Sequence, residues 1–377
     1  MPSWSLFVGL AIALTVLGVL PRPVAAQTPG ALHSLVDGEA LFLAGCAGCH
    51  GPDGSGMPDS TVGFEKPATF PDFSGCDQSS PEFESGWRAV IHDGGRARGF
   101  SPIMPAFGDL LSSTQIDAIV KYVRSLCRDH TWPVGELNLP RPLNVEKAFP
   151  ENETVVTSSI GARRGRDVTT TIAYERRFGA RGQLEVALPF SVMHGPPATS
   201  RGIGDISLGF KRVLVSTMRT GSIASVQGEV VLPTGNSDKG LGSGVTVFEG
   251  FGAFGQLLAG ESFVQGQAGA EFPGDTRDNP RAVFARIAVG KMLREGQGRG
   301  RLWAPMLELL TDREFERGAA TNYDLVPQFQ VTLSRRQHVR ANVGLQLPIN
   351  RKEGRPVQVQ MYLLWDWFDG GFVEGWK

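Results

Sequence analysis

The chain has 377 residues, of which 41% are hydrophobic and 20% are charged, and its formal net charge is −1. This length suggests two or three domains, and the near-neutral charge gives no electrostatic footprint for nucleic acid. The mean hydropathy of −0.09 excludes a helical membrane protein with many spans. By composition alone, the chain is typical of a soluble protein with two domains.

Two asymmetries divide the chain in the region of residues 130–150. The four cysteines all lie on the N-terminal side: Cys46, Cys49, Cys76 and Cys127. Residues 1–144 hold 9 Lys and Arg against 14 Asp and Glu, a net charge of −5. Residues 145–377 hold 28 against 24, a net charge of +4. We therefore expect two chemically different domains.

Residues 1–26 have the features of a secretory signal peptide. Residues 4–20 are apolar, prolines follow directly, and small residues precede an expected cleavage site after Ala26. An uncleaved membrane anchor is the alternative, but this apolar stretch is short for a span. No Lys or Arg precedes the stretch, which departs from the usual signal. Export would bring the mature chain to an oxidising compartment, where disulfides persist.

Residues 46–50 read Cys-Ala-Gly-Cys-His, which is the C-x-x-C-H attachment motif of c-type haem. Two thiols one helical turn apart can each add to one haem vinyl group, and the adjacent histidine can bind the iron. Half of a zinc site or a thioredoxin-like redox pair are the alternatives. A zinc site needs a second pair of ligands at suitable spacing, and a redox pair does not need His50.

The sequence around this motif resembles class I c-type cytochromes. A short predicted helix precedes the cysteine pair, and a glycine-rich turn follows at residues 51–56. Residues 103–108, Ile-Met-Pro-Ala-Phe-Gly, are similar to the MPxF loop of the family, and residues 111–128 are similar to its last helix. The resemblance covers about residues 36–128 and implies an all-α cytochrome c fold for residues 27–130.

This resemblance implies a cofactor and four site residues. The cofactor is one covalently attached haem c, with Cys46 and Cys49 as the thioether cysteines. His50 and Met104 are the axial iron ligands and hence the metal-binding residues. A methionine opposite a histidine raises the reduction potential of the haem.

For five further residues, the resemblance to class I c-type cytochromes leaves more than one role open. His92 is the rival of Met104, and we interpret it as a surface or propionate-side residue. Pro67 and Pro71 are alternatives for the proline whose carbonyl bonds the proximal histidine in the family. Cys76 and Cys127 are extra to the family core, and in an exported domain they most simply form a disulfide. Two buried thiols are the alternative.

Residues 131–152 contain four prolines among polar residues and predict a Pro-rich linker. Beyond it apolar and polar residues alternate, as in the stretches 183–193 and 338–348, which predicts about 12 strands. Most are 9–13 residues long, which suits a transmembrane β-barrel better than a globular sheet. We assign residues 153–377 to an all-β antiparallel barrel domain.

Loop lengths favour this barrel over a soluble periplasmic β-sandwich, which also has alternating strands. Short and long connections alternate along the chain, as expected for short periplasmic turns and long outer loops. Trp365, Trp367 and Phe368 are expected to belong to an interfacial aromatic belt. The tail 369–377 is a departure from outer-membrane barrels, which usually end at an aromatic residue. A barrel of this size can be filled by side chains or a plug.

The segments 202–209 and 228–235 resemble a broad group of outer-membrane transporter-like barrels. These motifs are loose, and they identify no transported substrate. The resemblance implies a barrel over about residues 150–368.

Together these patterns predict a monohaem c-type cytochrome anchored to the bacterial outer membrane by its barrel, with the cytochrome domain in the periplasm. A haem with both axial positions filled offers no open iron site, so we expect an electron carrier without catalytic residues, although enzymatic activity stays open. The expected partners are a periplasmic redox protein and the membrane, and not nucleic acid. The alternatives are an outer-membrane transporter with a haem redox domain and a soluble periplasmic haem protein with a β-sandwich.

One hypothesis concerns how the two domains meet. The predicted periplasmic turns are rich in arginine: Arg181, Arg219, Arg294, Arg299, Arg335 and Arg336. Because the haem domain is acidic, we expect it to dock on these turns through charge. The alternative is that the arginines are simply solvated.

Overall fold

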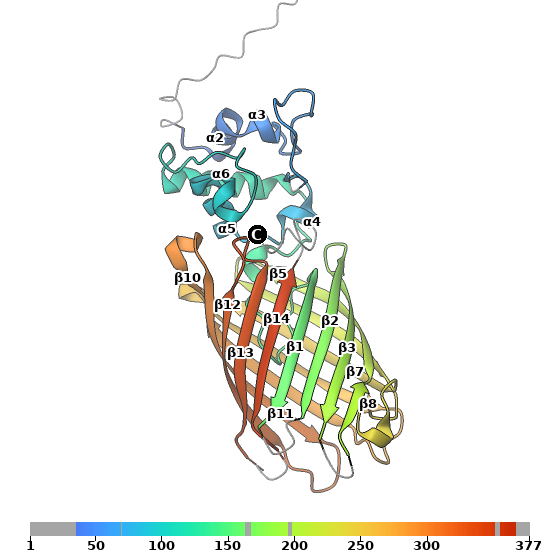
Figure 1. Cartoon of the computed structure of the whole chain (residues 1–377). Coiled ribbons are helices and arrows are strands. Elements are labelled where there is room, and N and C mark those ends of the chain that lie inside the picture. The colour runs from blue at the N-terminus through green and yellow to red at the C-terminus, as the bar shows by residue number, and fades with distance from the viewer. Residues whose placement is uncertain (1–34, 69, 163–166, 195–197, 351–354, 367–377) are drawn as a thin grey trace, which may run out of the picture.

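The computed structural model describes residues 35–68, 70–162, 167–194, 198–350 and 355–366. The expected signal peptide and the C-terminal tail lie outside these residues, and so do Trp367 and Phe368. A small helical domain sits on one end of a β-barrel (Figure 1). The expected order of an all-α domain followed by an all-β barrel is therefore confirmed. Within the described residues, no helix has both the length and the apolar character that a membrane span requires.

The helical domain contains short helices, and side chains cap the starts of α2 and α6. Its α-helices are α2 (Gly38–Gly45), α3 (Ala47–His50), α4 (Cys76–Ser79), α5 (Glu84–Asp93) and α6 (Ser113–Leu126). The 3-10 turns of the chain are η1 (Gly95–Arg98), η2 (Gly135–Leu137), η3 (Ser237–Lys239), η4 (Ala259–Glu261) and η5 (Glu295–Gly298). Asp37 caps α2 by accepting from the backbone of Ala40 at 2.9 Å. Ser112 and Gln115 form a capping box at the start of α6.

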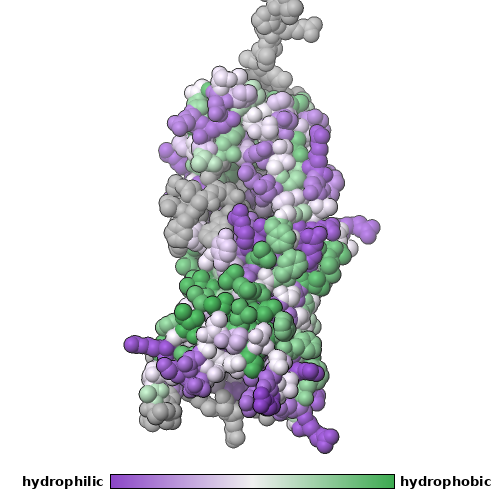
Figure 2. Space-filling model, turned by 90° about the vertical axis from the view of Figure 1, so that its right-hand side faces the viewer, coloured by the Kyte–Doolittle hydropathy of each residue, from purple (hydrophilic) through white to green (hydrophobic). Residues whose placement is uncertain are grey.

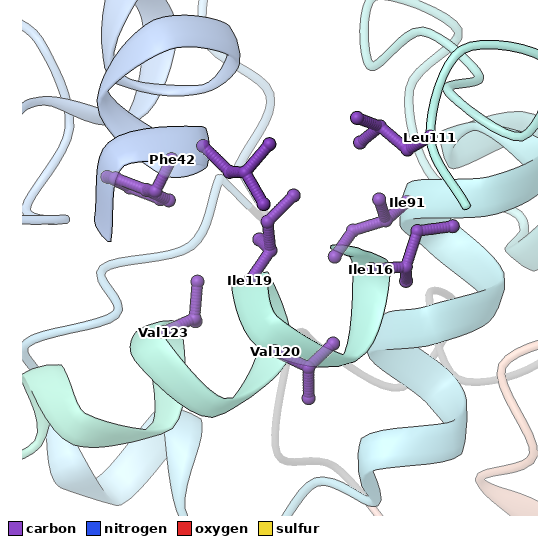
Figure 3. Packing of buried hydrophobic residues seen from close by; sticks show 8 residues of the cluster. Phe42, Ile91, Leu111, Ile116, Ile119, Val120 and Val123 are labelled. Carbon is purple, nitrogen blue, oxygen red and sulfur yellow. The ribbon is translucent and has the colours of Figure 1, made fainter. Parts of the chain in front are cut away.

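One apolar face of α6 organises the core of the helical domain. This core consists of Leu41, Phe42, Ile91, Leu111, Ile116, Ile119, Val120 and Val123 (Figure 3). The residues of α6 recur at helical spacing, so they form one stripe that packs on α2 and α5. Gly38 lies where α2 crosses α6, because a Cβ atom there would overlap the carbonyl of Ala118.

The barrel wall consists of twelve of the fourteen described strands. These are β1 (Glu153–Gly161), β2 (Val168–Phe178), β3 (Gly182–Met193), β5 (Ile206–Thr217), β6 (Ser222–Leu232), β7 (Val247–Leu257), β8 (Ser262–Pro273), β9 (Ala282–Lys291), β11 (Leu302–Glu314), β12 (Asn322–Thr332), β13 (Val339–Pro348) and β14 (Gln358–Asp366). Two short strands, β4 (Ser200–Ile203) and β10 (Leu293–Arg294), extend its rims. The predicted strand count and lengths are confirmed.

The sheet closes on itself, so the alternative of a β-sandwich is wrong. Strand β1 pairs with both β2 and β14, and β9 pairs with β11 across the β10 excursion. Every one of the twelve long strands has an antiparallel neighbour on each side. Closure satisfies the backbone hydrogen bonds that a sandwich leaves open at its edges.

The barrel is apolar outside and polar inside, the reverse of a soluble protein. Exposed side chains on the outer face include Leu184, Phe190, Leu208, Phe210, Phe248, Val289, Val343 and Leu345. Leu184, for example, is 55% exposed. Buried polar side chains on the lumen face include Glu175, Lys211, Gln265, Glu308, Gln328 and Gln330. Figure 2 shows apolar side chains gathered around the middle of the wall, with hydrophilic ones near its far end.

Trp365 does not belong to an exposed aromatic belt. It lies near the end of β14 and is only 7% exposed. The expectation of an interfacial role for this residue is therefore wrong, because its ring is covered at the end of the barrel that carries the helical domain.

Most of the predicted Pro-rich linker is folded into the barrel lumen. Residues 137–151, which we call the plug, are mostly buried and turn back before β1. Its apolar residues Leu137, Ala148 and Phe149 pack on side chains of β5, β6, β7 and β9. Prolines keep this stretch irregular, but the lumen surrounds it, so it is not an exposed spacer.

Polar lumen side chains satisfy the backbone of the plug. Glu308 of β11 accepts from the backbone N–H groups of Asn144 and Val145, at 2.9 and 2.8 Å. Gln265 of β8 donates to the carbonyl of Pro140 at 2.7 Å, and Gln328 of β12 accepts from the backbone of Leu143 at 3.0 Å. These bonds are required because an irregular segment inside a barrel has no ladder partners.

A buried ion cluster anchors the plug to β1 and β2. The Arg141 guanidinium lies 2.7 Å from Glu153 and 2.6 Å from Glu175, through Nη1, and 3.0 Å from Glu146 through Nη2. Both strand carboxylates are fully buried. One arginine therefore ties the plug to two neighbouring strands.

The two segments that resemble transporter-like barrels meet where the turn between β4 and β5 contacts the long loop between β6 and β7. Asp205 accepts from the backbone of Gly235 at 2.9 Å and from the backbone of Ser243 at 2.6 Å. Thr234 donates to the carbonyl of Gly204 at 2.9 Å. The motif residues therefore stabilise the loop between β6 and β7 at the barrel end away from the helical domain.

Candidate haem site

All four predicted site residues line one cavity of about 350 Å³, which lies between the helices and the end of the barrel. Cys46, Cys49 and His50 reach it from α3 and its N-cap, and Met104 reaches it from the loop before α6. Its volume falls within the range of about 300–1,000 Å³ that is usual for small-molecule and cofactor sites. Its walls are largely aromatic and aliphatic. The tertiary structure thus brings together the two motifs, which are far apart in sequence.

Aromatic rings hold His50 in place. Its imidazole stacks on Phe70 with ring centroids 5.1 Å apart, and Phe73 lies at 4.9 Å. Burial lowers the pKa of His50 to about 4, so the ring is neutral near pH 7, the form that binds metals. Its Nδ1 atom is buried without a hydrogen-bond partner among the described residues.

The two cysteines of the motif are free and half-buried at one end of the cavity. Burial, with a smaller contribution from Cys49, raises the pKa of the Cys46 thiol to about 11. The thiol is therefore protonated at neutral pH. Two thiols, a neutral imidazole and a thioether around an apolar cavity match the donor set that a covalently attached haem requires.

The loop that carries Met104 is tied to the end of α5. The carbonyl of Met104 accepts from the backbone of Gly95 at 3.0 Å, and the backbone of Phe107 donates to Ile91 at 2.9 Å. These bonds keep the Met-Pro-x-Phe segment against the cavity. Its rival, His92, does not line the cavity, and contacts Asp93 at 2.6 Å and Arg299 at 3.4 Å.

Both proline alternatives, Pro67 and Pro71, line the cavity. The carbonyl of Pro67 accepts from the backbone of Phe70 at 2.9 Å. The family-based role of a proline carbonyl toward His50 stays a prediction.

The sequence profile described as "Cytochrome c" matches residues 35–127. Cytochrome c6 of Picosynechococcus sp. is 31% identical over 124 residues, which cover 33% of this chain and 97% of that protein. The chain belongs to the cytochrome c family. The family assignment concerns the helical domain, which we now call the cytochrome domain, and it implies a covalently bound haem c.

Solved structures similar to the chain include bacterial porins. A KdgM porin in complex with disordered oligogalacturonate has a TM-score of 0.39 and 7% identity, covering 57% of this chain and 99% of that chain. A NanC porin has a TM-score of 0.40 and 5% identity, covering 57% of this chain and 98% of that chain.

The two cysteines outside the haem motif form the expected disulfide. Cys76 at the start of α4 and Cys127 at the end of α6 have Cα atoms 5.0 Å apart and are bonded. The alternative of two buried thiols is wrong. The bond joins the loop before α5 to the last helix, so it closes the cytochrome domain around the cavity.

The cytochrome domain rests on the arginine-rich turns of the barrel, as the docking hypothesis expected. Arg299 forms an ion pair with Asp93 at 3.5 Å. Arg294 donates to the Ser85 hydroxyl at 2.9 Å. Arg181 donates to the carbonyl of Thr131, directly after the domain, at 3.2 Å. Hydrogen bonds to neutral acceptors thus accompany the ion pair, and steering by charge stays a prediction.

Sequence reasoning missed the barrel residues that complete the cavity. Arg336, Gln337, His338, Arg340 and Asp366 line it from the barrel, and Asn138 lines it from the plug. The five barrel residues lie more than 200 positions from the haem motif. Only the arginine-rich turns gave a signal for them, and that signal pointed to docking rather than to the cavity.

Proposed function

We propose that this protein is a monohaem electron carrier of the bacterial outer membrane. The observation that carries this proposal is the convergence of Cys46, Cys49, His50 and Met104 on one apolar cavity. Cys46 and Cys49 would hold the haem by thioethers, and His50 and Met104 would bind its iron. When bound, the haem supplies reversible one-electron transfer between ferric and ferrous states.

In this proposal, the cytochrome domain positions the haem and provides its surroundings. The aromatic rings around His50 exclude water and fix the imidazole plane. A thioether from Met104 would favour the ferrous state of the haem. Because His50 and Met104 would both bind the iron, the site suits electron transfer to a periplasmic redox protein rather than catalysis.

The barrel supplies the membrane anchor in this proposal. Its outer face is apolar, its lumen is polar, and its strands are 9 to 13 residues long, which is the pattern of a bilayer-spanning barrel. The start of β1, the end of β14 and the short turns lie on the side of the cytochrome domain (Figure 1). Since outer-membrane barrels keep short turns in the periplasm, the cytochrome domain would be periplasmic.

The plug bears on the alternative of a haem-linked transporter. Residues 137–151 occupy the lumen and are bonded to side chains of several strands. A substrate path would require these contacts to break. The anchor is therefore the function that the barrel supports best.

Membrane fractionation with haem staining tests the proposal. Full-length protein produced with the host haem-attachment system should give a haem-stained band in the outer-membrane fraction, which migrates differently after heating. The matched control, Cys46→Ala with Cys49→Ala, should give the same heat-modifiable band without haem stain. Release of the haem-stained protein by osmotic shock would disprove membrane anchoring, and a lack of haem stain in the parent protein would disprove the carrier.

A further inference from the structure

The haem cavity does not close within the cytochrome domain. One end is formed by the Cys-x-x-Cys-His motif, and the other by the turn between β12 and β13 together with the end of β14. In Figure 1, α3 lies on the side of the cytochrome domain away from the barrel, and the β13 and β14 ends face that domain. The cavity therefore extends from the haem motif to the barrel rim.

The chemistry of haem gives this cavity a direction. The two vinyl groups lie on two neighbouring pyrroles, and the two propionates lie on the two opposite pyrroles. Because Cys46 and Cys49 would hold the vinyl edge at one end, the propionate edge must point toward the other. The propionates are anionic, so the groups at that end decide whether they are stabilised.

The barrel end of the cavity is rich in buried arginine. Arg98 of the cytochrome domain is only 3% exposed, and it donates to the carbonyls of Gly298 and Arg335 on two barrel turns. Its Nε atom is buried without a hydrogen-bond partner among the described residues. The carboxylates of Glu82 and Asp93 act on its charge without forming an ion pair with it. A buried guanidinium without a paired anion is unfavourable.

Two barrel arginines lie beside it at the cavity. Arg336 is buried, donates to the carbonyl of Gly99 at 3.0 Å and lies over the ring of Phe100 at 4.3 Å. Arg340 is buried as well, and its Nη2 lies 3.0 Å from Asp366.

The same end holds two carboxylates and one histidine. Asp366 is paired with Arg340 and also with His338, whose other ring nitrogen lies 3.5 Å from Glu82. Among the described residues, Arg98, Arg336 and Arg340 therefore line this end of the cavity together with these two carboxylates. Guanidinium groups at this place can donate hydrogen bonds to the carboxylates of an anionic ligand.

We propose that the haem propionates lie at the barrel rim and are bound by Arg98 and Arg336, with Arg340 in support. The barrel wall is then a part of the haem site as well as an anchor. This inference rests on the proposed function, because it requires haem c in the cavity. It assigns the β12–β13 turn a role in setting the haem potential.

The predicted consequence is a potential that depends on barrel residues. A cation near the propionates favours ferrous over ferric haem, because the ferric centre carries one more positive charge. Arg336→Gln should lower the midpoint potential of the full-length holoprotein. We expect up to about a tenfold change in the ferrous-to-ferric equilibrium, which is about 59 mV for one electron.

The matched control is Arg335→Gln on the same turn. Arg335 has an exposed side chain that does not line the cavity, and only its backbone carbonyl contacts Arg98. This variant removes the same charge but should leave the potential unchanged. Arg336→Lys, which keeps the charge, should restore most of the loss.

A variant that should raise the midpoint potential separates the effect of charge from the effect of loosened packing. Asp366→Asn removes an anion from the same end and should raise the potential, and it also decides the question if Arg336→Gln does not fold. Equal potentials in Arg335→Gln and Arg336→Gln, or a fall in Asp366→Asn, with a retained haem spectrum, would overturn the inference. Loss of haem from the parent protein would instead overturn the proposed function.

Discussion

The disulfide between Cys76 and Cys127 is expected to supply a large part of the stability of the cytochrome domain. The cysteines are 51 positions apart. Removing a cross-link that closes a loop of this length releases about 14 cal/mol/K of chain entropy, or about 4 kcal/mol at 25 °C. Cys76→Ala with Cys127→Ala should therefore remove about 4 kcal/mol from the free energy of unfolding of this domain.

The assay is guanidinium chloride unfolding of the full-length holoprotein in detergent, followed by the haem absorbance. This signal reports on the cytochrome domain, because that domain would carry the haem. With a denaturant dependence of about 4 kcal/mol/M, the midpoint should fall by about 1 M.

Reduction provides the control for this experiment. A reductant should lower the midpoint of the parent protein to that of the double variant and should not affect the variant, because thioethers are not reducible by thiols. A loss of less than about 1 kcal/mol would show that the unfolded domain is already restrained by other means, and would refute the entropic reasoning.

Four further changes test the haem ligand, the helix crossing and, in two ways, the plug. Met104→Ala should abolish the methionine–iron charge-transfer band of the ferric spectrum and lower the potential, and a retained band would rule out this ligand. Gly38→Ala should destabilise the cytochrome domain by about 1–3 kcal/mol, because the added Cβ atom would overlap the backbone of α6. The control is Gly63→Ala, whose Cβ atom would have no atom within 4 Å, and it should be close to neutral in the same unfolding assay. Arg141→Leu leaves two buried glutamates without their arginine and should lower the free energy of unfolding of the barrel by about 3–5 kcal/mol. Heat-modified migration on a gel should then show unfolding at a lower temperature. An unchanged transition temperature would contradict the role of this cluster. Replacing residues 139–149 by a Gly/Ser linker should open the lumen and produce conductance in planar bilayers, whereas equal conductance of the parent protein would show that the plug does not close it.

The haem motif, the strands and the division into domains could be predicted from the sequence because they depend on local patterns. The spacing of Cys46, Cys49 and His50 is set by one helical turn, and the alternation of the strands by the two faces of a pleated sheet. The apolar positions of α6 repeat with the helical period for the same reason. The strand count was predictable because each strand is separated from the next by turn residues.

Only the tertiary structure decided what the polar and proline-rich stretches do. Residues 131–152 look like a solvated linker because they lack a periodic pattern, but the lumen supplies partners such as Glu308 and Gln265 for their backbone. Trp365 looked like an interfacial residue, but it is covered at the end of the barrel.

The overall composition is typical of a soluble protein, and the structure explains why this interpretation was wrong. The moderate mean hydropathy results from an apolar outer face and a polar lumen in the same strands. The balanced net charge results from an acidic cytochrome domain on a basic barrel, and some of that basic charge, at Arg336 and Arg340, lies against the haem cavity. Local spacing determines the Cys-x-x-Cys-His motif, whereas contacts between distant segments determine that barrel residues line the same cavity.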